Sequence, residues 1–206
     1  MSTISTGPLA LRAEIECSDM SGFDVRATDI RIEGLSTPCL LLSAARMQRN
    51  IARLKSHLRA LGTPLRPHLK TSKSVEIARL LMPTPAGPAT VSTIKEAEQF
   101  AAAGVRDILY AVGIAPMKLP RVVALRKAGT DLSIVLDSLE QAKAVTAACG
   151  DAKERIPVLI EIDSDGHRAG IRPGDPLLQR WLHAHGTLCA GPQRCHRGAR
   201  RCVCIL

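Results

Sequence analysis

A histidine and a lysine lie two residues apart in the segment Arg66-Pro67-His68-Leu69-Lys70-Thr71-Ser72-Lys73. In an extended segment such residues point to the same side, so His68 and Lys70 can serve one site. A short apolar run precedes this octapeptide and a helical pattern begins at Ser74, which places Lys70 just past the carboxyl end of a strand. A lysine amine in a largely dry pocket there acts as a nucleophile or Schiff-base partner. The alternative is a solvated lysine in a basic loop, and the octapeptide alone favours it.

The surrounding chain repeats a strand and a helix about every 24 residues, a pattern typical of parallel strands with helical crossovers. Ser43 marks one helix start, and two capping-box pairs mark others, Thr93 with Glu96 and Ser138 with Gln141. The predicted strands cover residues 37–42, 64–67, 89–91, 107–112, 131–136 and 156–162. The predicted helices cover residues 46–61, 74–82, 93–104, 116–129, 138–150 and 177–185.

Two α/β architectures fit this repeat, a doubly wound open sheet and a TIM-type (β/α) barrel. No glycine-rich phosphate turn follows the first strand, which weakens the dinucleotide-binding version of the open sheet. The uniform length of the units favours the barrel, which has eight of them when complete. A seventh strand is expected to open at residues 187–191, after which the pattern fails. We therefore expect an incomplete parallel barrel of about six to seven βα units.

Three segments follow from this pattern. Residues 1–34 have no sustained period and are expected to form a partly disordered leader. Residues 35–190 are expected to form the partial barrel, and residues 191–206 an irregular tail rich in arginine and cysteine. The abrupt change near residue 190 indicates a truncated or frame-shifted end.

Composition excludes several classes of protein. The net charge is +9, but Arg194, Arg197, Arg200 and Arg201 supply four of these charges and aromatic residues are only 2%. Few aromatic stacking platforms and charges interspersed on helix faces make nucleic acid an unlikely partner. No signal peptide or membrane-spanning run is visible, and the seven scattered cysteines do not form a disulfide framework. A cytoplasmic protein is expected.

The cysteines and the histidine of the tail do not have the spacing of a zinc site. Its ligands would be Cys195, His196, Cys202 and Cys204. The spacing between Cys202 and Cys204 is shorter than zinc ligands usually have, and no partner pair lies upstream. We expect no metal site in this chain.

Three motifs resemble the fold-type III pyridoxal-phosphate enzymes, whose N-terminal barrel is that of alanine racemase. The octapeptide is similar to the R-P-H-x-K-T-x-K motif of the D-serine dehydratase and D-threonine aldolase group, with Ser72 where many relatives have histidine. Thr37-Pro38 and the later Arg49-Asn50-Ile51 are similar to that group's first strand and helix. The run from Glu161 to Gly170, EIDSDGHRAG, is similar to its sixth strand and the turn that follows. The resemblance covers roughly residues 35–190.

This resemblance implies that pyridoxal 5'-phosphate is bound through a Schiff base to Lys70, which then serves as acid and base at the substrate Cα. It implies that Arg168 donates hydrogen bonds to the phenolic oxygen of the cofactor. It also places His68 and Thr71 at the cofactor: His68 as a ring-packing or orienting group, with a hydrogen-bonded structural histidine as an equal alternative, and Thr71 as a brace of the turn.

The implied activity is that of a lyase acting on a small D-amino acid, by ammonia elimination from D-serine or retro-aldol cleavage of D-threonine. An amino-acid racemase, a non-catalytic cofactor-binding homologue and a basic nucleic-acid-binding protein are the alternatives. Full-length relatives are expected to be homodimers with a C-terminal β-domain and a divalent metal. We expect the β-domain and the metal ligands to be absent here, which leaves an inactive short form as an alternative to an active lyase.

Five further polar residues have two interpretations each. Arg66 shares the parity of Lys70 but is also suited to a structural role. Lys73 is expected at the surface, with a second catalytic amine as the alternative. Asp137 and Asp163 end strands, where they could reach the pocket or cap helices, and capping is the preferred assignment. Ser92 is equally suited to a cap or to the site.

Overall fold

The computed structural model describes residues 36–38, 41–178 and 180, and the chain divides into two compact units, Met1–Pro64 and Leu65–Leu206. In the first unit, helix α1 spans Ala44–Ala60. The Ser43 Oγ accepts a hydrogen bond from the Arg46 N–H, as the sequence predicts for a cap. The helix ends at Leu61, and Gly62 follows with a φ of +60°. The predicted strand 37–42 includes residues outside the described part, and residues 41–43 are not in a strand.

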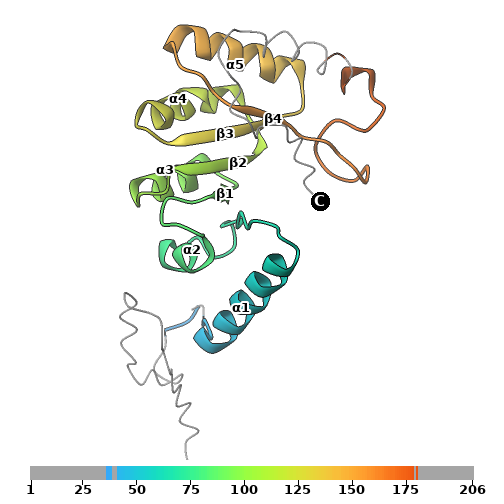
Figure 1. The fold of residues 1–206 in the computed structure, drawn as a ribbon. Helices are drawn as coiled ribbons and strands as arrows, with labels where there is room; N and C mark the ends of the chain where they lie inside the picture. Colours follow the sequence, from blue (N-terminus) through green and yellow to red (C-terminus); the bar gives the residue numbers. More distant parts are fainter. Residues whose placement is uncertain (1–35, 39–40, 179, 181–206) are drawn as a thin grey trace, which may run out of the picture. The chain divides into compact units, whose positions relative to one another are not determined.

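The second unit is built on a parallel sheet of four strands in the order β1-β2-β3-β4 (Figure 1). The strands are β1 (Ala89–Val91), β2 (Asp107–Gly113), β3 (Asp131–Leu136) and β4 (Val158–Ile160). Helix α2 (Val75–Leu81) precedes the sheet, and the crossovers are α3 (Ile94–Ala102), α4 (Leu119–Lys127) and α5 (Leu139–Ala152). A short 3₁₀ helix, η2 (Pro116–Lys118), leads into α4. Consecutive strands are neighbours, as the repeat predicts.

The core lies on one face of this sheet. Alternate strand residues enter it together with helix residues such as Phe100 and Val122. The strand residues of the core are Ala89, Val91, Ile108, Tyr110, Leu132, Ile134, Leu136 and Ile160. Because side chains alternate along a strand, Thr90, Leu109 and Val135 belong to the opposite face. Leu69 is fully buried in the same core, so the bridge residue before it, His68, belongs to the opposite face of the sheet.

The predicted strand 64–67 is wrong. The segment makes a single parallel bridge, between His68 and Thr90, and no strand is formed there. The Leu69 N–H donates to the Thr90 oxygen at 2.8 Å, and the Thr90 N–H donates to the Pro67 oxygen at 2.8 Å. Pro64 and Pro67 have no N–H to continue a ladder, which explains why the pairing stops at one bridge.

Two further boundaries differ from the sequence-based prediction. The strand predicted for 156–162 is shortened to β4, and Ile162 instead pairs with Ile171 in an isolated parallel bridge. The helix predicted to stop at Gly150 continues to Ala152 and ends with Lys153 in the left-handed region, at φ +53°. The backbone N–H of Lys153 donates to the Gly150 oxygen, so the final turn closes three residues beyond the glycine.

The described residues form an open four-stranded sheet, with isolated bridges between His68 and Thr90, Thr84 and Gly87, and Ile162 and Ile171. Closure into a barrel stays a prediction. The leader, the strand at 187–191, the arginine-rich tail and most of the helix at 177–185 lie outside the described residues. Within the part that is described, none of the helices has both the length and the apolar character needed to cross a bilayer.

Candidate functional site

Lys70 lies in a turn at the carboxyl end of β1. The bridge between His68 and Thr90 runs parallel to β1, so the chain leaves the sheet at Lys70 where β1 ends. Leu69 is buried in the core and His68 pairs with Thr90, so His68 belongs to the other face of the sheet, and Lys70 follows in the turn that leaves the bridge. Both side chains are exposed, so the described residues alone do not enclose Lys70 in a dry pocket. Carboxyl ends of parallel strands are where α/β proteins place their sites.

His68 and Lys70 are joined by a hydrogen bond from the Lys70 backbone N–H to the His68 Nδ1, at 3.3 Å. An accepting Nδ1 leaves the proton of the neutral imidazole on Nε2. Partial burial lowers the pKa of His68, the Lys70 charge lowers it further, and Glu96 acts in the opposite direction. The ring is therefore neutral at pH 7 and presents its Nε2–H as a donor.

The turn that carries Lys70 is closed by Lys73 and Ser74. The Lys73 N–H donates to the Leu69 oxygen at 2.9 Å, and Lys73 adopts a left-handed φ of +48°. The Ser74 Oγ accepts from the Ile77 N–H at 3.2 Å and caps α2. Thr71 has an exposed side chain, and both its bracing of the turn and its place at the cofactor stay predictions.

Glu96 brings the turn and helix α3 together. Its side chain is buried, and its Oε1 lies 3.4 Å from the Lys73 Nζ. Its Oε2 accepts from the backbone N–H groups of Ser92, at 2.9 Å, and Thr93, at 3.3 Å. The Thr93 Oγ1 accepts from the Glu96 N–H, which completes the predicted capping box. Lys73 is thus exposed, as expected, but paired with a buried carboxylate.

A second group of polar residues follows β4. Ile160 lies in the core and Ile162 packs against it, so Glu161 belongs to the opposite face. Glu161 is 8% exposed, and its Oε2 has no hydrogen-bond partner among the described residues. Burial raises the pKa of Glu161, as does the neighbouring Asp137, and Arg168 partly offsets them. The alternation of isoleucine with acids at 160–163 was the available sequence sign of this residue.

Asp163 holds the turn that carries Arg168. Its Oδ1 accepts from the backbone N–H groups of Gly166, at 3.0 Å, and Arg168, at 3.2 Å. Its own N–H donates to the Ile171 oxygen at 3.0 Å. The helix-capping role preferred for Asp163 is therefore wrong, and the same is true of Asp137, since Ser138 caps α5. Ser138 occupies the capping position next to Asp137, and Asp163 accepts hydrogen bonds from the N–H groups of its own turn.

Arg168 is exposed on that turn. Among the described residues no hydrogen bond or ion pair links its guanidinium to Lys70 or His68. The structure thus brings together His68, Lys70 and Thr71 in one turn, and places Arg168 with Glu161 at β4. The role of each at a cofactor stays a prediction.

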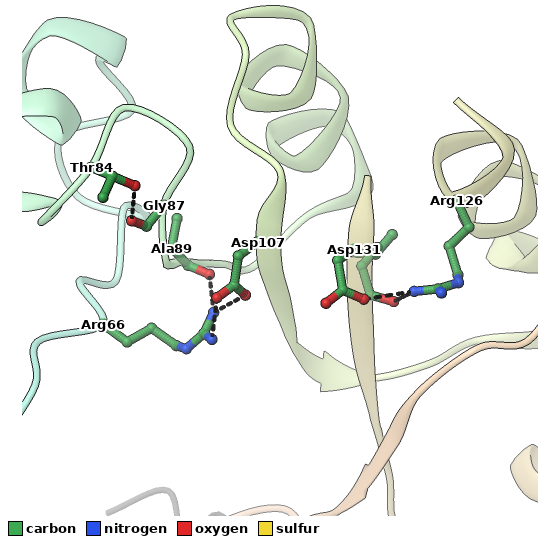
Figure 2. A network of polar contacts seen from close by, with 8 residues as sticks. Arg66, Thr84, Gly87, Ala89, Asp107, Arg126 and Asp131 are labelled. Carbon is green, nitrogen blue, oxygen red and sulfur yellow. Dashed lines mark hydrogen bonds and ion pairs between the residues drawn. The ribbon is translucent and has the colours of Figure 1, made fainter. Parts of the chain in front are cut away.

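Arg66 belongs to the opposite end of the sheet, where β1 and β2 begin (Figure 2). Its Nη1 lies 2.8 Å from the Asp107 Oδ1, and its Nη2 donates to the Oδ2 at 2.9 Å. The Nη1 also donates to the Ala89 oxygen at 3.2 Å. These contacts favour the structural role over the role in the site.

No three side chains of histidine, cysteine, aspartate or glutamate come together as a metal site among residues 36–38, 41–178 and 180. The described residues do not fit the divalent metal expected of full-length relatives.

The sequence of residues 42–190 matches the family model described as alanine racemase, N-terminal domain. The chain belongs to this family. It is 48% identical to the D-threo-3-hydroxyaspartate dehydratase of Delftia sp. (strain HT23) over 161 residues, which cover 76% of this chain and 42% of that enzyme. It is 30% identical to the D-serine dehydratase of Dictyostelium discoideum over 157 residues, covering 72% of this chain and 39% of that protein.

A solved structure supports the same family membership. The alanine racemase-like protein of Idiomarina loihiensis has a TM-score of 0.71 at 48% identity, covering 76% of this chain and 41% of that one. The chain spans about two fifths of the length of these relatives. The family predicted from the octapeptide and its companion motifs is confirmed.

Proposed function

We propose that this chain carries the cofactor lysine of a pyridoxal-phosphate-dependent lyase that acts on D-amino acids with a hydroxyl group on Cβ. The observation that carries the proposal is the position of Lys70, exposed in the turn at the carboxyl end of β1, in a chain 48% identical to a D-threo-3-hydroxyaspartate dehydratase. Within this class we favour elimination of ammonia, since that relative is named a dehydratase. The finer architecture proposed with it is the closed barrel, as a homodimer in the complete enzyme.

The residues present fit the cofactor. Pyridoxal phosphate has an aldehyde, a phenolic oxygen, a ring nitrogen and a phosphate, all of which need polar partners. The exposed Lys70 amine is free to reach the aldehyde, and two buried oxygens on this side of the sheet lack partners among the described residues, Ser92 Oγ and Glu161 Oε2. Both follow the carboxyl ends of strands, where a polar ligand would satisfy them.

Each residue is assigned a task that its chemistry allows. Lys70 would hold the cofactor through its aldehyde and would move a proton at the substrate Cα. His68 would help to orient the cofactor through its Nε2–H, and Arg168 would hold the phenolic oxygen by hydrogen bonds. Thr71, next to Lys70, is a further hydroxyl donor. When bound, the cofactor supplies the electron sink for charge that develops at Cα.

The test is product analysis on the full chain supplied with pyridoxal phosphate. We expect D-threo-3-hydroxyaspartate to give ammonia and a 2-oxo acid, with D-serine and D-threonine as comparison substrates. Glycine and an aldehyde would instead indicate the aldolase reaction. Bound cofactor with neither product would contradict the lyase proposal, and chiral analysis of the amino acid would then identify a racemase.

A further inference from the structure

We propose that the ion pair between Lys73 and Glu96 is a positioning device for Lys70, which fixes the turn that presents the lysine amine to the cofactor. The inference rests on the proposed function for the identity of that cofactor. It assigns a role to Lys73, which the sequence places at the surface, and to Glu96, which the sequence predicts as part of a helix cap. Three independent features of the structure support it.

The first feature is the backbone of Lys73. Its φ of +48° lies in the left-handed region, which costs an ordinary residue free energy and which glycine adopts without strain. Such conformations persist where the surroundings enforce them. Here the Lys73 N–H closes the turn onto the Leu69 oxygen at 2.9 Å, with Lys70 inside it. A lysine at a position suited to glycine indicates that its side chain is needed.

The second feature is the charge on Glu96. As the third residue of α3 it closes a capping box, but a cap requires only an acceptor oxygen. The other capping box of this unit shows this, because Gln141 accepts from the N–H groups of Asp137 and Ser138 with a neutral amide. Glu96 is 4% exposed, and a buried carboxylate is costly without an opposite charge. Its charge therefore serves the Lys73 ammonium, 3.4 Å away.

The third feature is where the pair lies. Glu96 Oε2 accepts from the Ser92 N–H at 2.9 Å, directly after β1. The pair thus joins the turn holding Lys70 to the carboxyl end of the strand that faces it. On the other side of Lys70, His68 accepts the Lys70 N–H at 3.3 Å. The backbone of Lys70 is consequently held from both directions.

Two variants remove one charge each. Lys73→Gln keeps a polar side chain, and Glu96→Gln keeps the acceptor that the cap needs. Lys73→Arg restores the cation and tests rescue. Matched controls lie on the same helix: Lys95→Gln removes an exposed lysine, and Glu98→Gln breaks the ion pair of Glu98 with Arg121, 2.6 Å long.

The first measurement is hydrogen–deuterium exchange of the full chain without cofactor. We expect exchange in residues 69–73 to rise about fivefold in Lys73→Gln and Glu96→Gln, the factor for an ion pair of ordinary strength. Lys73→Arg, Lys95→Gln and Glu98→Gln should exchange as the parent does. If exchange is unchanged in both Lys73→Gln and Glu96→Gln, the inference is overturned, whether or not the cofactor binds.

The second measurement is the rate at which added pyridoxal phosphate attaches covalently to Lys70. We expect slower attachment in Lys73→Gln and Glu96→Gln. Lys73→Arg should restore the parent rate, and both controls should keep it. Equal rates in all five would overturn the positioning role. A parent chain that never attaches the cofactor would instead contradict the proposed function, and the positioning role with it.

Discussion

Asp107 and Asp131 are register partners at the start of the neighbouring parallel strands β2 and β3. Two like charges side by side destabilise a sheet unless each is compensated. Each aspartate has its own arginine: Arg66 contacts Asp107 at 2.8 Å, and Arg126 contacts Asp131 at 3.1 Å (Figure 2). Lys70 leaves the sheet at the other end. Stabilising contacts and candidate chemistry thus occupy opposite ends of the strands, as in barrel enzymes.

Removing the first arginine should reduce stability without affecting the cofactor. Arg66→Met removes the cation that contacts Asp107, which still lies beside the negatively charged Asp131. We expect a loss of about 1 kcal/mol in the free energy of unfolding. The double variant with Asp107→Asn should recover most of that loss. Denaturant unfolding measures both. A stable Arg66→Met variant that no longer attaches pyridoxal phosphate would contradict the structural role.

Gly170 should not tolerate a side chain. Its φ is +116°, and a Cβ there would lie 2.8 Å from the Asp163 nitrogen and 3.0 Å from the Glu161 oxygen. We expect Gly170→Ala to cost about 2–4 kcal/mol of unfolding free energy, since backbone must move. Gly174→Ala is the control, because at φ +86° its Cβ meets no atom within 4 Å and only the backbone strain of about 1 kcal/mol remains. Equal losses in the two variants would refute this account of the turn.

The titration of His68 should report on both of its charged neighbours. Lys70 lowers its pKa and Glu96 raises it, so Lys70→Ala should raise the pKa and Glu96→Gln should lower it further. Between the lowered folded value and the ordinary 6.5, the unfolded chain binds a proton that the folded chain does not. Stability through His68 is therefore lost as the pH falls through this window. The ring-proton shifts in NMR spectra measure the pKa, and shifts of the opposite sign would contradict the geometry.

Glu161 should destabilise the fold at neutral pH. Burial and Asp137 raise its pKa above the ordinary 4.5, so between 4.5 and the raised value the folded chain keeps a proton that the unfolded chain releases. Stability through Glu161 therefore falls as the pH rises through that window. We expect Glu161→Gln to be more stable than the parent at pH 7, with the difference vanishing near pH 4. Denaturant unfolding of both proteins at the two pH values measures this difference in stability. A difference that does not depend on pH would indicate an effect of packing instead of charge.

Local patterns predicted most of the framework. The two capping boxes, at Thr93 and Ser138, form as expected because serine or threonine and the glutamate or glutamine three residues later act within one turn. The strands at 89–91 and 131–136 have the predicted bounds, and alternate apolar residues of each are buried in the core. The strand at 64–67 was mispredicted because its prolines limit pairing, an effect that hydrophobicity alone does not reveal.

The site was predictable only where it is contiguous in sequence. His68 and Lys70 lie together because only Leu69 separates them, and the Lys70 N–H donates to the His68 ring. The pairing of Lys73 with Glu96 depends on the packing of α3 beside the turn, which spacing does not encode. The partnerless Oε2 of Glu161 likewise follows from burial in the folded chain.

Cofactor attachment at Lys70 is the most direct test of the account. The full chain is incubated with pyridoxal phosphate, reduced with borohydride to make the bond permanent, and digested for mass spectrometry. We predict a cofactor adduct on Lys70 in the parent and in the control variant Lys95→Gln, and none in Lys70→Ala. An adduct on another lysine, or equal labelling of Lys70→Ala and the parent, would contradict the assignment of Lys70.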